Sequence, residues 1–323
     1  MLMDEKTIYA LGFFDVVHLG HQALLTACRA LAEQTGCKAG VLTFDLHPQA
    51  LVAGQPPLLI NTLEDRHRLL RQYGMQNICT LPFDEGLRTM PWKDFFELLV
   101  TRYNAGGLVC GDDFRFGYRG EGTADLLRQA CESAGLPCTI VPAQLLDGVR
   151  ISSTHIRKLL ADGNMEDVAQ FLGHPHILTD RVAHGKKIGS STLGFPTVNL
   201  HIPTGEVVPG RGLGHTMGTP TANLQIPEGV LLPGQGVYAC KATLEQGQTC
   251  LAVTNIGSRP TVDGHHITVE PWLLDFTGDL YRHRLTLSFH AFLRREEKFP
   301  SLADLKAQIW EDARKTRKIF ENQ

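Results

Sequence analysis

The strongest constraint on the fold is a change of hydrophobic pattern near residue 176 of this 323-residue chain. Before that point, apolar runs that suit buried strands alternate with segments whose apolar residues recur at helical spacing. The predicted strands are 7–14, 37–44, 77–81, 107–110 and 137–141, and the predicted helices are 21–34, 62–74, 92–103 and 124–134. Such alternation predicts an α/β domain, in which helices cover both faces of a parallel sheet.

The second part of the chain has a different pattern. From about 176 to 292, short β-like runs alternate with Gly and Pro turns, and helical periodicity returns only at 301–320. Regularly spaced strands of this kind predict a small barrel or sandwich, here closed by one C-terminal helix. Because single hydrophobic cores rarely grow beyond ~250–300 residues, we expect two domains, 1–174 and 175–323.

Charge and composition narrow the class of protein. The 31 Lys and Arg residues nearly balance 34 Asp and Glu residues, and a net charge of −3 argues against a dedicated nucleic-acid-binding protein. No apolar stretch approaches the ~20 residues of a membrane span, and the N-terminal segment lacks the features of a secretory signal. None of the eight cysteines forms a CxxC pair, as expected for reduced thiols. We therefore expect a cytoplasmic protein without a membrane partner, and the sequence does not indicate an oligomeric state.

A first candidate site follows the first predicted strand, which ends near Gly12 and leads through His18, Gly20 and His21 into a helix. The N-terminus of a helix favours anions, and Gly20 lets a phosphate approach the backbone closely. Both imidazoles can donate to a polyphosphate, and positive charge there would stabilise a developing pentavalent phosphorus. The spacing alone also suits two surface histidines beside a turn. Their place after the first strand of an α/β sheet, the usual ligand crevice, favours the phosphate site.

Two further motifs support a nucleotide site in the first domain. Ser152, Ser153 and Thr154 precede a helical run, where they can cap the helix and bind phosphate oxygens, and Arg157 can pair with a phosphate. An ordinary helix cap fits the same residues and is compatible with phosphate binding. The segment GDDFRFG, residues 111–117, places two adjacent carboxylates near an arginine.

The second domain contains an internal repeat. Residues 196–210, PTVNLHIPTGEVVPG, match residues 220–234, PTANLQIPEGVLLPG, at nine of fifteen positions, which indicates a local tandem duplication. A glycine-rich loop precedes each copy and suits a phosphate cradle. In each copy a Thr and an Asn two residues apart would share one face of a strand. Two neutral oxygen ligands beside phosphate oxygens suit Mg²⁺, although a polar turn is the alternative.

Glu270 is a candidate general base in the second domain. It alternates with apolar neighbours in the predicted strand VEPWLLDF, and a half-buried carboxylate in such a strand can accept a proton from a substrate. An exposed glutamate on an edge strand fits the pattern equally well.

Taken in order, GFFDVVHLGH, GDDFRFG and ISSTHIR resemble the nucleotidyltransferase half of the bacterial bifunctional riboflavin kinase/FMN adenylyltransferase family, also called FAD synthetase, over roughly residues 7–173. GVYA, TNIGSRPT and FLRREEKF, together with the segment around Glu270, resemble the riboflavin kinase half over about 178–312. The resemblance implies a Rossmann-like α/β nucleotidyltransferase domain with a parallel sheet. A small six-stranded β-barrel riboflavin kinase domain with a C-terminal helix would follow.

The resemblance also implies the reactions and their substrates. Riboflavin would be phosphorylated to FMN with MgATP in the second domain, and FMN adenylylated to FAD with release of pyrophosphate in the first. Riboflavin, FMN and ATP would thus be the small-molecule substrates, with Mg²⁺ as the metal ion.

Roles for individual residues follow from the same resemblance. His18 and His21 would hold the ATP phosphates, and Glu270 would deprotonate the ribityl 5′-hydroxyl for attack on the γ-phosphate. The expected ATP- and phosphate-binding residues are Gly12, Asp15, Gly20, Asp113, Ser153, Thr154, Arg157, Gly212, Gly214 and Gly218. The expected metal-positioning residues are Thr221 and Asn223, or Thr197 and Asn199 of the other copy.

The sequence departs from the family pattern at two main places, and a smaller departure is Tyr281-Arg282, where the family usually has Tyr-Gly. Val16 stands where the family usually has a glycine, and a β-branched residue is strained if that position needs a positive φ. The family carries one PTAN motif, whereas this chain carries two copies. We favour the second copy because its loop has the regular length and runs at normal spacing into GVYA.

These departures motivate an alternative, a flavin- or nucleotide-binding protein in which one or both activities are impaired. A third hypothesis, an adenylyl- or cytidylyltransferase for another substrate, is disfavoured by the flavin-kinase pattern of the second domain.

Overall fold

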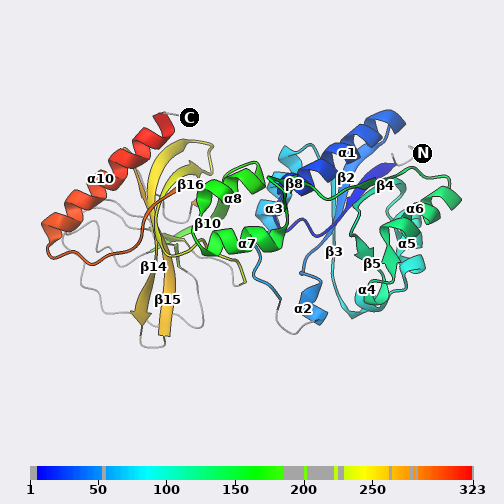
Figure 1. Ribbon diagram of the computed structural model, residues 1–323, viewed down its shortest axis with the longest axis horizontal. Coiled ribbons are helices and arrows are strands. Elements are labelled where there is room, and N and C mark those ends of the chain that lie inside the picture. Colours follow the sequence, from blue (N-terminus) through cyan, green and yellow to red (C-terminus); the bar gives the residue numbers. More distant parts are fainter. Residues whose placement is uncertain are drawn as a thin grey trace. The chain divides into compact units, whose positions relative to one another are not determined.

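The computed structural model describes residues 6–52, 56–184, 200–201, 222–224, 229–261, 264–276, 280 and 283–321 (Figure 1). The chain divides into two units, Met1–His155 and Ile156–Gln323. This division precedes the domain boundary expected at 174/175. The physical reason is that helix α8 (Met165–Leu172) packs on strands β10 (His176–His184) and β16 (Arg284–Arg294) of the second unit.

The first unit is built on five parallel strands in the order β3-β2-β1-β4-β7, which confirms the predicted α/β class. The strands are β1 (Thr7–Leu11), β2 (Lys38–Phe44), β3 (Asn77–Leu81), β4 (Ala105–Gly111) and β7 (Cys138–Val141). The larger helices are α1 (Leu19–Thr35), α3 (Leu63–Gln72), α5 (Trp92–Thr101) and α6 (Ala124–Ser133). Helix α7 (Ser153–Ala161) spans the division between the units.

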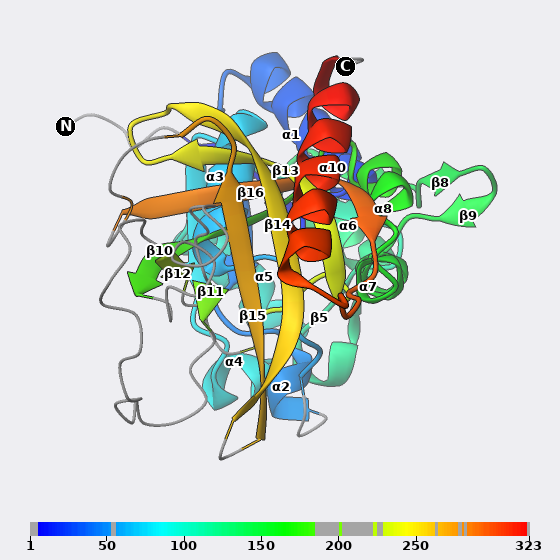
Figure 2. The same cartoon turned by 90° about the vertical axis from the view of Figure 1, so that its left-hand side faces the viewer.

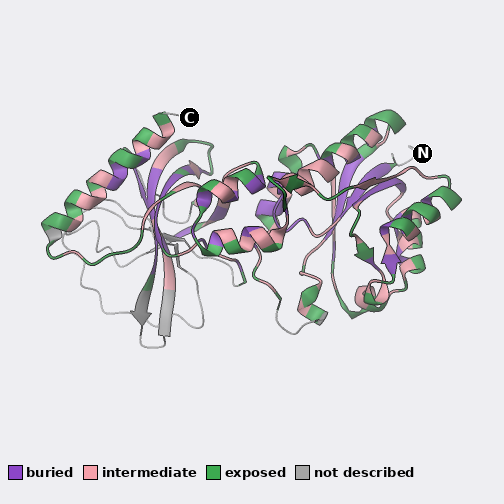
Figure 3. Cartoon of the chain, in the orientation of Figure 1, coloured by how far each residue is buried: buried purple, intermediate pink, exposed green. Residues whose placement is uncertain are grey.

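The local sequence explains where these elements form. Every residue of β1 is buried, as expected for a central strand covered on both faces (Figure 3). Helix α1 begins after His18, whose side chain caps it, and ends at Gly36 in the left-handed conformation. Thr62 caps α3 in the same way, by accepting from the Asp65 N–H. Capping and burial pattern therefore set the main boundaries of this unit.

The shorter elements of the first unit carry too little periodicity to be predicted. They are the helices α2 (Gln49–Val52) and α4 (Glu85–Thr89), the 3₁₀ turn Tyr118–Gly120, and two hairpins, β5 (Arg115–Phe116) with β6 (Gly122–Thr123) and β8 (Leu145–Leu146) with β9 (Val149–Arg150).

The second unit contains an antiparallel sheet in the order β11-β15-β14-β13-β16-β10-β12. Its further strands are β11 (Leu200–His201), β12 (Ala222–Leu224), β13 (Gly236–Leu244), β14 (Thr249–Thr261) and β15 (Gly264–Leu273). The expected number of six strands is wrong for the described part of the sheet, which has seven. The reason is the duplication: β11 belongs to the first copy and pairs with β15, whereas β12 belongs to the second copy and pairs with β10.

Helix α10 (Leu302–Glu321) covers one face of this sheet, as predicted for the C-terminal helix (Figure 2). Val237, Val253 and Trp272 form a buried cluster with Ala313 of the helix. Side chains alternate along a strand, so neighbouring residues such as Tyr238 and Cys240 face the opposite side, where they are fully buried. Among the described residues, no helix is long and apolar enough to cross a membrane.

Candidate functional site

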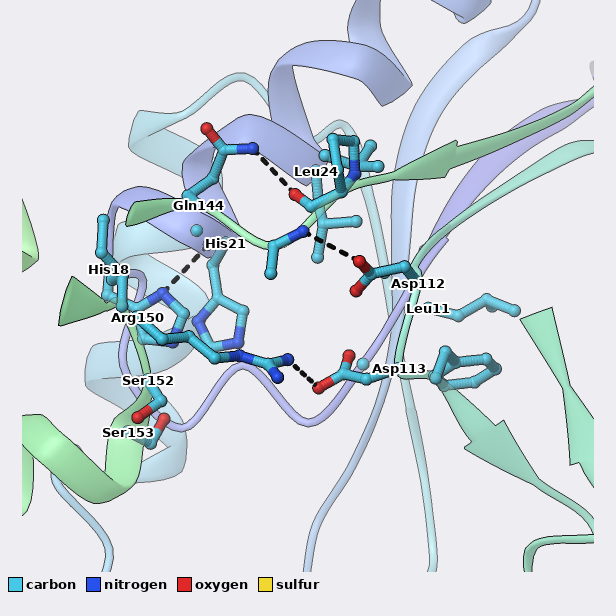
Figure 4. A pocket seen from close by; sticks show the side chains of 18 residues that line it. Leu11, His18, His21, Leu24, Asp112, Asp113, Gln144, Arg150, Ser152 and Ser153 are labelled. Atoms are coloured by element: carbon cyan, nitrogen blue, oxygen red, sulfur yellow. Dashed lines mark hydrogen bonds and ion pairs between the residues drawn. The ribbon is translucent and has the colours of Figure 1, made fainter. Parts of the chain in front are cut away.

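A pocket of about 490 Å³ lies at the carboxyl ends of β1, β4 and β7 in the first unit (Figure 4). The strand order reverses between β1 and β4, and such a switch point is the usual ligand crevice of a parallel sheet. Of the predicted residues, Gly12, His18, Gly20, His21, Asp113 and Ser153 line it.

The two histidines lie together at the N-terminus of α1. Their rings stack with centroids 3.7 Å apart and an interplanar angle of 6°. The His21 N–H donates to Nδ1 of His18 at 3.1 Å, which makes His18 the helix cap. Nδ1 of His21 hydrogen-bonds to the Val16 carbonyl, so in the neutral ring Nδ1 carries the proton and Nε2 is an acceptor. The histidines are therefore held by the turn that precedes the helix.

Burial affects the protonation of His21. It lowers the pKa of the imidazole to about 4, although the Val16 carbonyl and the Asp113 carboxylate both act to raise it. The His21 ring is therefore neutral at pH 7 in the nucleotide-free protein, and this imidazole supplies no positive charge before an anion binds. A polyphosphate beside the ring would favour the charged form.

Two glycines give the turn room for its aromatic rings. A Cβ at residue 20 would lie 3.2 Å from the His18 ring, and a Cβ at residue 12 would lie 3.1 Å from the Phe14 ring. The Phe14 ring in turn contacts His21, with centroids 5.0 Å apart. Gly12 and Gly20 therefore allow the close packing that fixes both histidines.

The pocket also contains an ion pair. The Arg150 guanidinium, on β9, donates to the Asp113 carboxylate, and both side chains are more than half exposed (Figure 4). Arg150 lies within the motif RISSTHIR but was not among the predicted site residues, because position in a motif gives no orientation. Its ion pair with Asp113 gives the pocket one cation and one anion that a nucleotide can engage.

The ISST motif is only partly in the pocket. Ser152 and Ser153 line it, and Ser152 accepts from the His155 N–H as a helix cap. Thr154 is exposed and is not a lining residue. Arg157 follows in α7 and belongs to the second unit, so its predicted role stays a prediction.

Asp15 is buried and does not line the pocket, so the structure places it apart from the other residues expected to bind phosphate in the loop after β1. Its carboxylate is buried and accepts from the Ile60 N–H at 3.0 Å. Buried Arg66, which the sequence did not single out, donates to the carbonyls of Phe13 and Phe44 at 2.8 and 3.1 Å. The Asp15 carboxylate also raises the pKa of the Arg66 guanidinium, against the larger lowering effect of burial. Asp15 and Arg66 therefore stabilise the loop after β1 from its buried side.

Val16 does not carry the strain that its replacement of a glycine suggested. The positive φ of this turn lies at Phe14, at 53°, and the Val16 side chain is fully buried. Its carbonyl accepts from the His18 N–H at 2.9 Å and from the His21 ring. The backbone of Val16 holds both histidines, and its side chain belongs to the core.

We predict that Val16→Gly lowers stability without increasing FAD formation. The substitution removes a buried side chain and adds backbone freedom, which together cost about 2–4 kcal/mol. Thermal unfolding and an FAD-formation assay well below the unfolding temperature test this. An increase in FAD formation in the glycine variant would contradict the prediction and show that Val16 restrains the activity that the family resemblance implies.

In the second unit, Glu270 is half-buried on β15 and pairs across the ladder with Asn255. The Asn255 amide donates to the Glu296 carboxylate at 2.9 Å. Because side chains alternate, Glu270 lies on the same face of the sheet as Trp272. Glu270 therefore lies beside Asn255 of the motif TNIGSRPT, and the Asn255 amide in turn contacts Glu296 of the motif FLRREEKF.

The other predicted residues of the second unit are only partly described. Gly212, Gly214, Gly218, Thr221, Thr197 and Asn199 lie outside the described residues, and Asn223 is described through its backbone, which pairs with Ala183. In the described part of the chain, no group of three or more His, Cys, Asp or Glu side chains could hold a metal ion. That finding does not concern a metal held by neutral oxygens and substrate phosphates, which is the kind of site that the Thr/Asn pair predicts.

Known proteins match both units. A family model described as FAD synthetase matches residues 2–155, and one described as riboflavin kinase matches 172–205 and 201–320, in two segments that meet at the duplication. The bifunctional riboflavin kinase/FMN adenylyltransferase of Escherichia coli K12 is 34% identical over 98% of this chain and 94% of its own length. The chain belongs to this family.

Further relatives agree with this assignment. The bifunctional riboflavin kinase/FMN adenylyltransferases of Listeria monocytogenes and Bacillus subtilis are 31% and 30% identical over 98% and 99% of this chain, and over 93% and 94% of their own lengths. A crystal structure described as a macrolide-efflux protein from Streptococcus pneumoniae superposes with a TM-score of 0.81 at 26% identity, covering 98% of this chain and 95% of that one. The family resemblance and the fold class predicted from the sequence are confirmed. The alternative of an impaired binding protein is not supported.

Proposed function

We propose that FMN is adenylylated in the pocket at the carboxyl ends of β1, β4 and β7, and that riboflavin is phosphorylated beside Glu270 in the second unit. The chain combines riboflavin kinase and FMN adenylyltransferase activities, both ATP-dependent transfers. The observation that carries the residue-level proposal is the stacked pair His18 and His21 at a helix N-terminus, facing Asp113 and Ser153 across one pocket.

The first unit would bind ATP with its phosphates at the N-terminus of α1. The FMN phosphate oxygen attacks the α-phosphorus of ATP, the bond to the β-phosphate oxygen breaks, and pyrophosphate leaves without a covalent enzyme intermediate. His21 would donate from Nε2 to the leaving pyrophosphate once the anion has raised its pKa. Arg150, released from Asp113 by the substrate, would supply a second positive charge.

The second unit would bind riboflavin so that Glu270 accepts the proton of the ribityl 5′-hydroxyl. That oxygen attacks the γ-phosphorus of ATP, and ADP leaves. Mg²⁺, when bound, would neutralise charge on the phosphates. This ion suits two oxygen ligands from one copy of the repeat, namely the Thr hydroxyl and the Asn amide oxygen of the motif PTVN or PTAN.

The duplication requires a choice between copies, and the sequence favours Thr221 and Asn223. Strands of both copies lie near β15, which carries Glu270. We predict that Asn223→Ala reduces FMN formation by about 10²-fold or more, whereas Asn199→Ala changes it by less than about twofold. Riboflavin kinase assays on the two matched variants check this, and the reverse pattern would assign the site to the first copy.

A substrate panel tests the proposed adenylyl transfer. We would supply ATP or CTP with FMN or with other phosphate monoesters, and follow pyrophosphate release. The proposal expects rapid release only with ATP and FMN. Faster release with another phosphate monoester would favour a nucleotidyltransferase of different specificity.

A further inference from the structure

Three successive residues form one wall of the adenylylation pocket, and hydrogen bonds join them to the elements on both sides. This wall segment, residues 142–144, follows β7 and precedes the β8–β9 hairpin (Figure 4). Pro142 and Ala143 are exposed and Gln144 is half-buried, so apolar burial does little to hold the segment in place. Its position must come from hydrogen bonds.

Asp112 provides the bonds on the β4 side. Its N–H donates to the Val141 carbonyl at 3.1 Å, and its carboxylate accepts from the Ala143 N–H at 3.1 Å. Regular pairing of β4 with β7 ends at Gly111 and Val141, one residue before this point. Pro142 has no N–H, so the Ala143 N–H, which donates to the Asp112 carboxylate, is the first backbone donor of the wall segment.

The other side of the wall segment is bonded to the phosphate motif. The Ile151 N–H donates to the Gln144 carbonyl at 3.0 Å, and Ser152 and Ser153, which follow it, line the pocket. The Gln144 side chain donates to the Pro142 carbonyl at 2.8 Å within the segment. A continuous series of bonds therefore runs from Asp112 through the wall segment to the serines.

The two adjacent carboxylates thus have different partners. Asp113 pairs with the Arg150 guanidinium across the pocket, whereas Asp112 accepts from a backbone amide. We propose that Asp112 is a positioning residue for FMN adenylylation, which holds the wall segment and through it the Ser152–Ser153 motif in the geometry that binds ATP. This inference rests on the proposed function of the pocket.

Two substitutions at Asp112 separate positioning from a direct role of its charge. Asp112→Asn keeps a side-chain oxygen that can accept from Ala143, and Asp112→Ala removes it. We expect the Ala variant to raise the KM for ATP about tenfold, as for the loss of one hydrogen bond to a charged group, with a smaller change in kcat. The Asn variant is expected to stay within about threefold of wild type.

The bifunctional chain supplies its own control. Riboflavin kinase activity of both variants should equal that of the wild type, and Asp125→Asn, which removes the carboxylate that pairs with Arg128 on α6, should leave both activities unchanged. Hydrogen exchange in a peptide covering residues 142–151 should speed up in the Ala variant and stay unchanged in the Asn variant.

An Asn variant as impaired as the Ala variant would overturn the proposal, because the charge of Asp112 would then act directly. An unchanged KM for ATP in the Ala variant would overturn it as well. If the Ala variant also loses kinase activity through misfolding, the Asn variant alone decides. A KM for ATP within about threefold of wild type then supports the proposal, and a rise of about tenfold overturns it. Each variant is compared with the wild type, so these results test the role of Asp112 alone. The proposed function itself would be contradicted by wild-type protein that forms no FAD from FMN and ATP.

Discussion

Replacing His21 by Asn is expected to reduce FAD formation from supplied FMN by about 10²–10³-fold, because the leaving pyrophosphate loses a preorganised donor. The Asn amide nitrogen can occupy the position of Nδ1 and keep the bond to the Val16 carbonyl, but nothing replaces Nε2. FMN formation from riboflavin, which takes place in the second unit, should remain at the wild-type level. Steady-state assays of each half-reaction measure both effects.

A pH signature accompanies this prediction. In the nucleotide-free protein the pKa of His21 is lowered to about 4, so the ring is neutral at neutral pH. A bound polyphosphate raises that pKa, so ATP binding takes up a proton, and affinity should fall as pH rises through the raised value. Calorimetry in buffers of different ionisation enthalpy detects the proton in the wild type, and the Asn variant should lack it.

A matched histidine outside the pocket is the control. His67 on α3 hydrogen-bonds to the Thr80 hydroxyl at 2.8 Å, and His67→Asn should change FAD formation by less than about twofold. The account would be wrong if His21→Asn retained wild-type FAD formation, or if both histidine variants lost it equally.

Glu270→Gln is expected to reduce FMN formation and to leave FAD formation unchanged, the reverse of the His21→Asn result. The Gln side chain keeps the size of the carboxylate and one acceptor oxygen but cannot accept the 5′-hydroxyl proton, so FMN formation should fall by about 10²–10⁴-fold. FAD formation from supplied FMN should not change, because β15 belongs to the second unit. Separate assays with riboflavin and with FMN as substrate distinguish the two effects.

Glu245→Gln is the matched control for this substitution. Glu245 lies in the exposed turn after β13, 3.9 Å from the His283 ring, and its replacement should leave FMN formation within about twofold of wild type. Substantial FMN formation by the Glu270 variant would remove Glu270 from the role of general base and make it a structural residue of the strand.

Much of the first unit could be predicted because its elements are long and periodic. The strand 77–81 has the predicted bounds, and helix α6 differs from its prediction by one residue, since Thr123 caps it and its buried face repeats at helical spacing. The approach of His18, His21 and Asp113 to one pocket also follows from sequence, because the carboxyl ends of parallel strands meet at one edge of the sheet.

Other features depend on tertiary contacts that leave no local pattern. Asp15 lies at the start of a predicted phosphate loop, yet its carboxylate turns into the core, where it accepts from the N–H of Ile60, 45 residues away. Asp112 and Asp113 are equivalent in sequence, but one meets a backbone amide and the other a guanidinium. The seventh strand arises because the two copies of the repeat pair with different strands of the sheet. Periodicity cannot reveal a partner so distant in the chain.

The most direct test of the account is a time course of purified wild-type protein with riboflavin and MgATP, followed by chromatography of the flavins. The account predicts that riboflavin is consumed, that FMN appears first, and that FAD then accumulates with release of pyrophosphate. Flavin that stays bound while neither FMN nor FAD forms would contradict it.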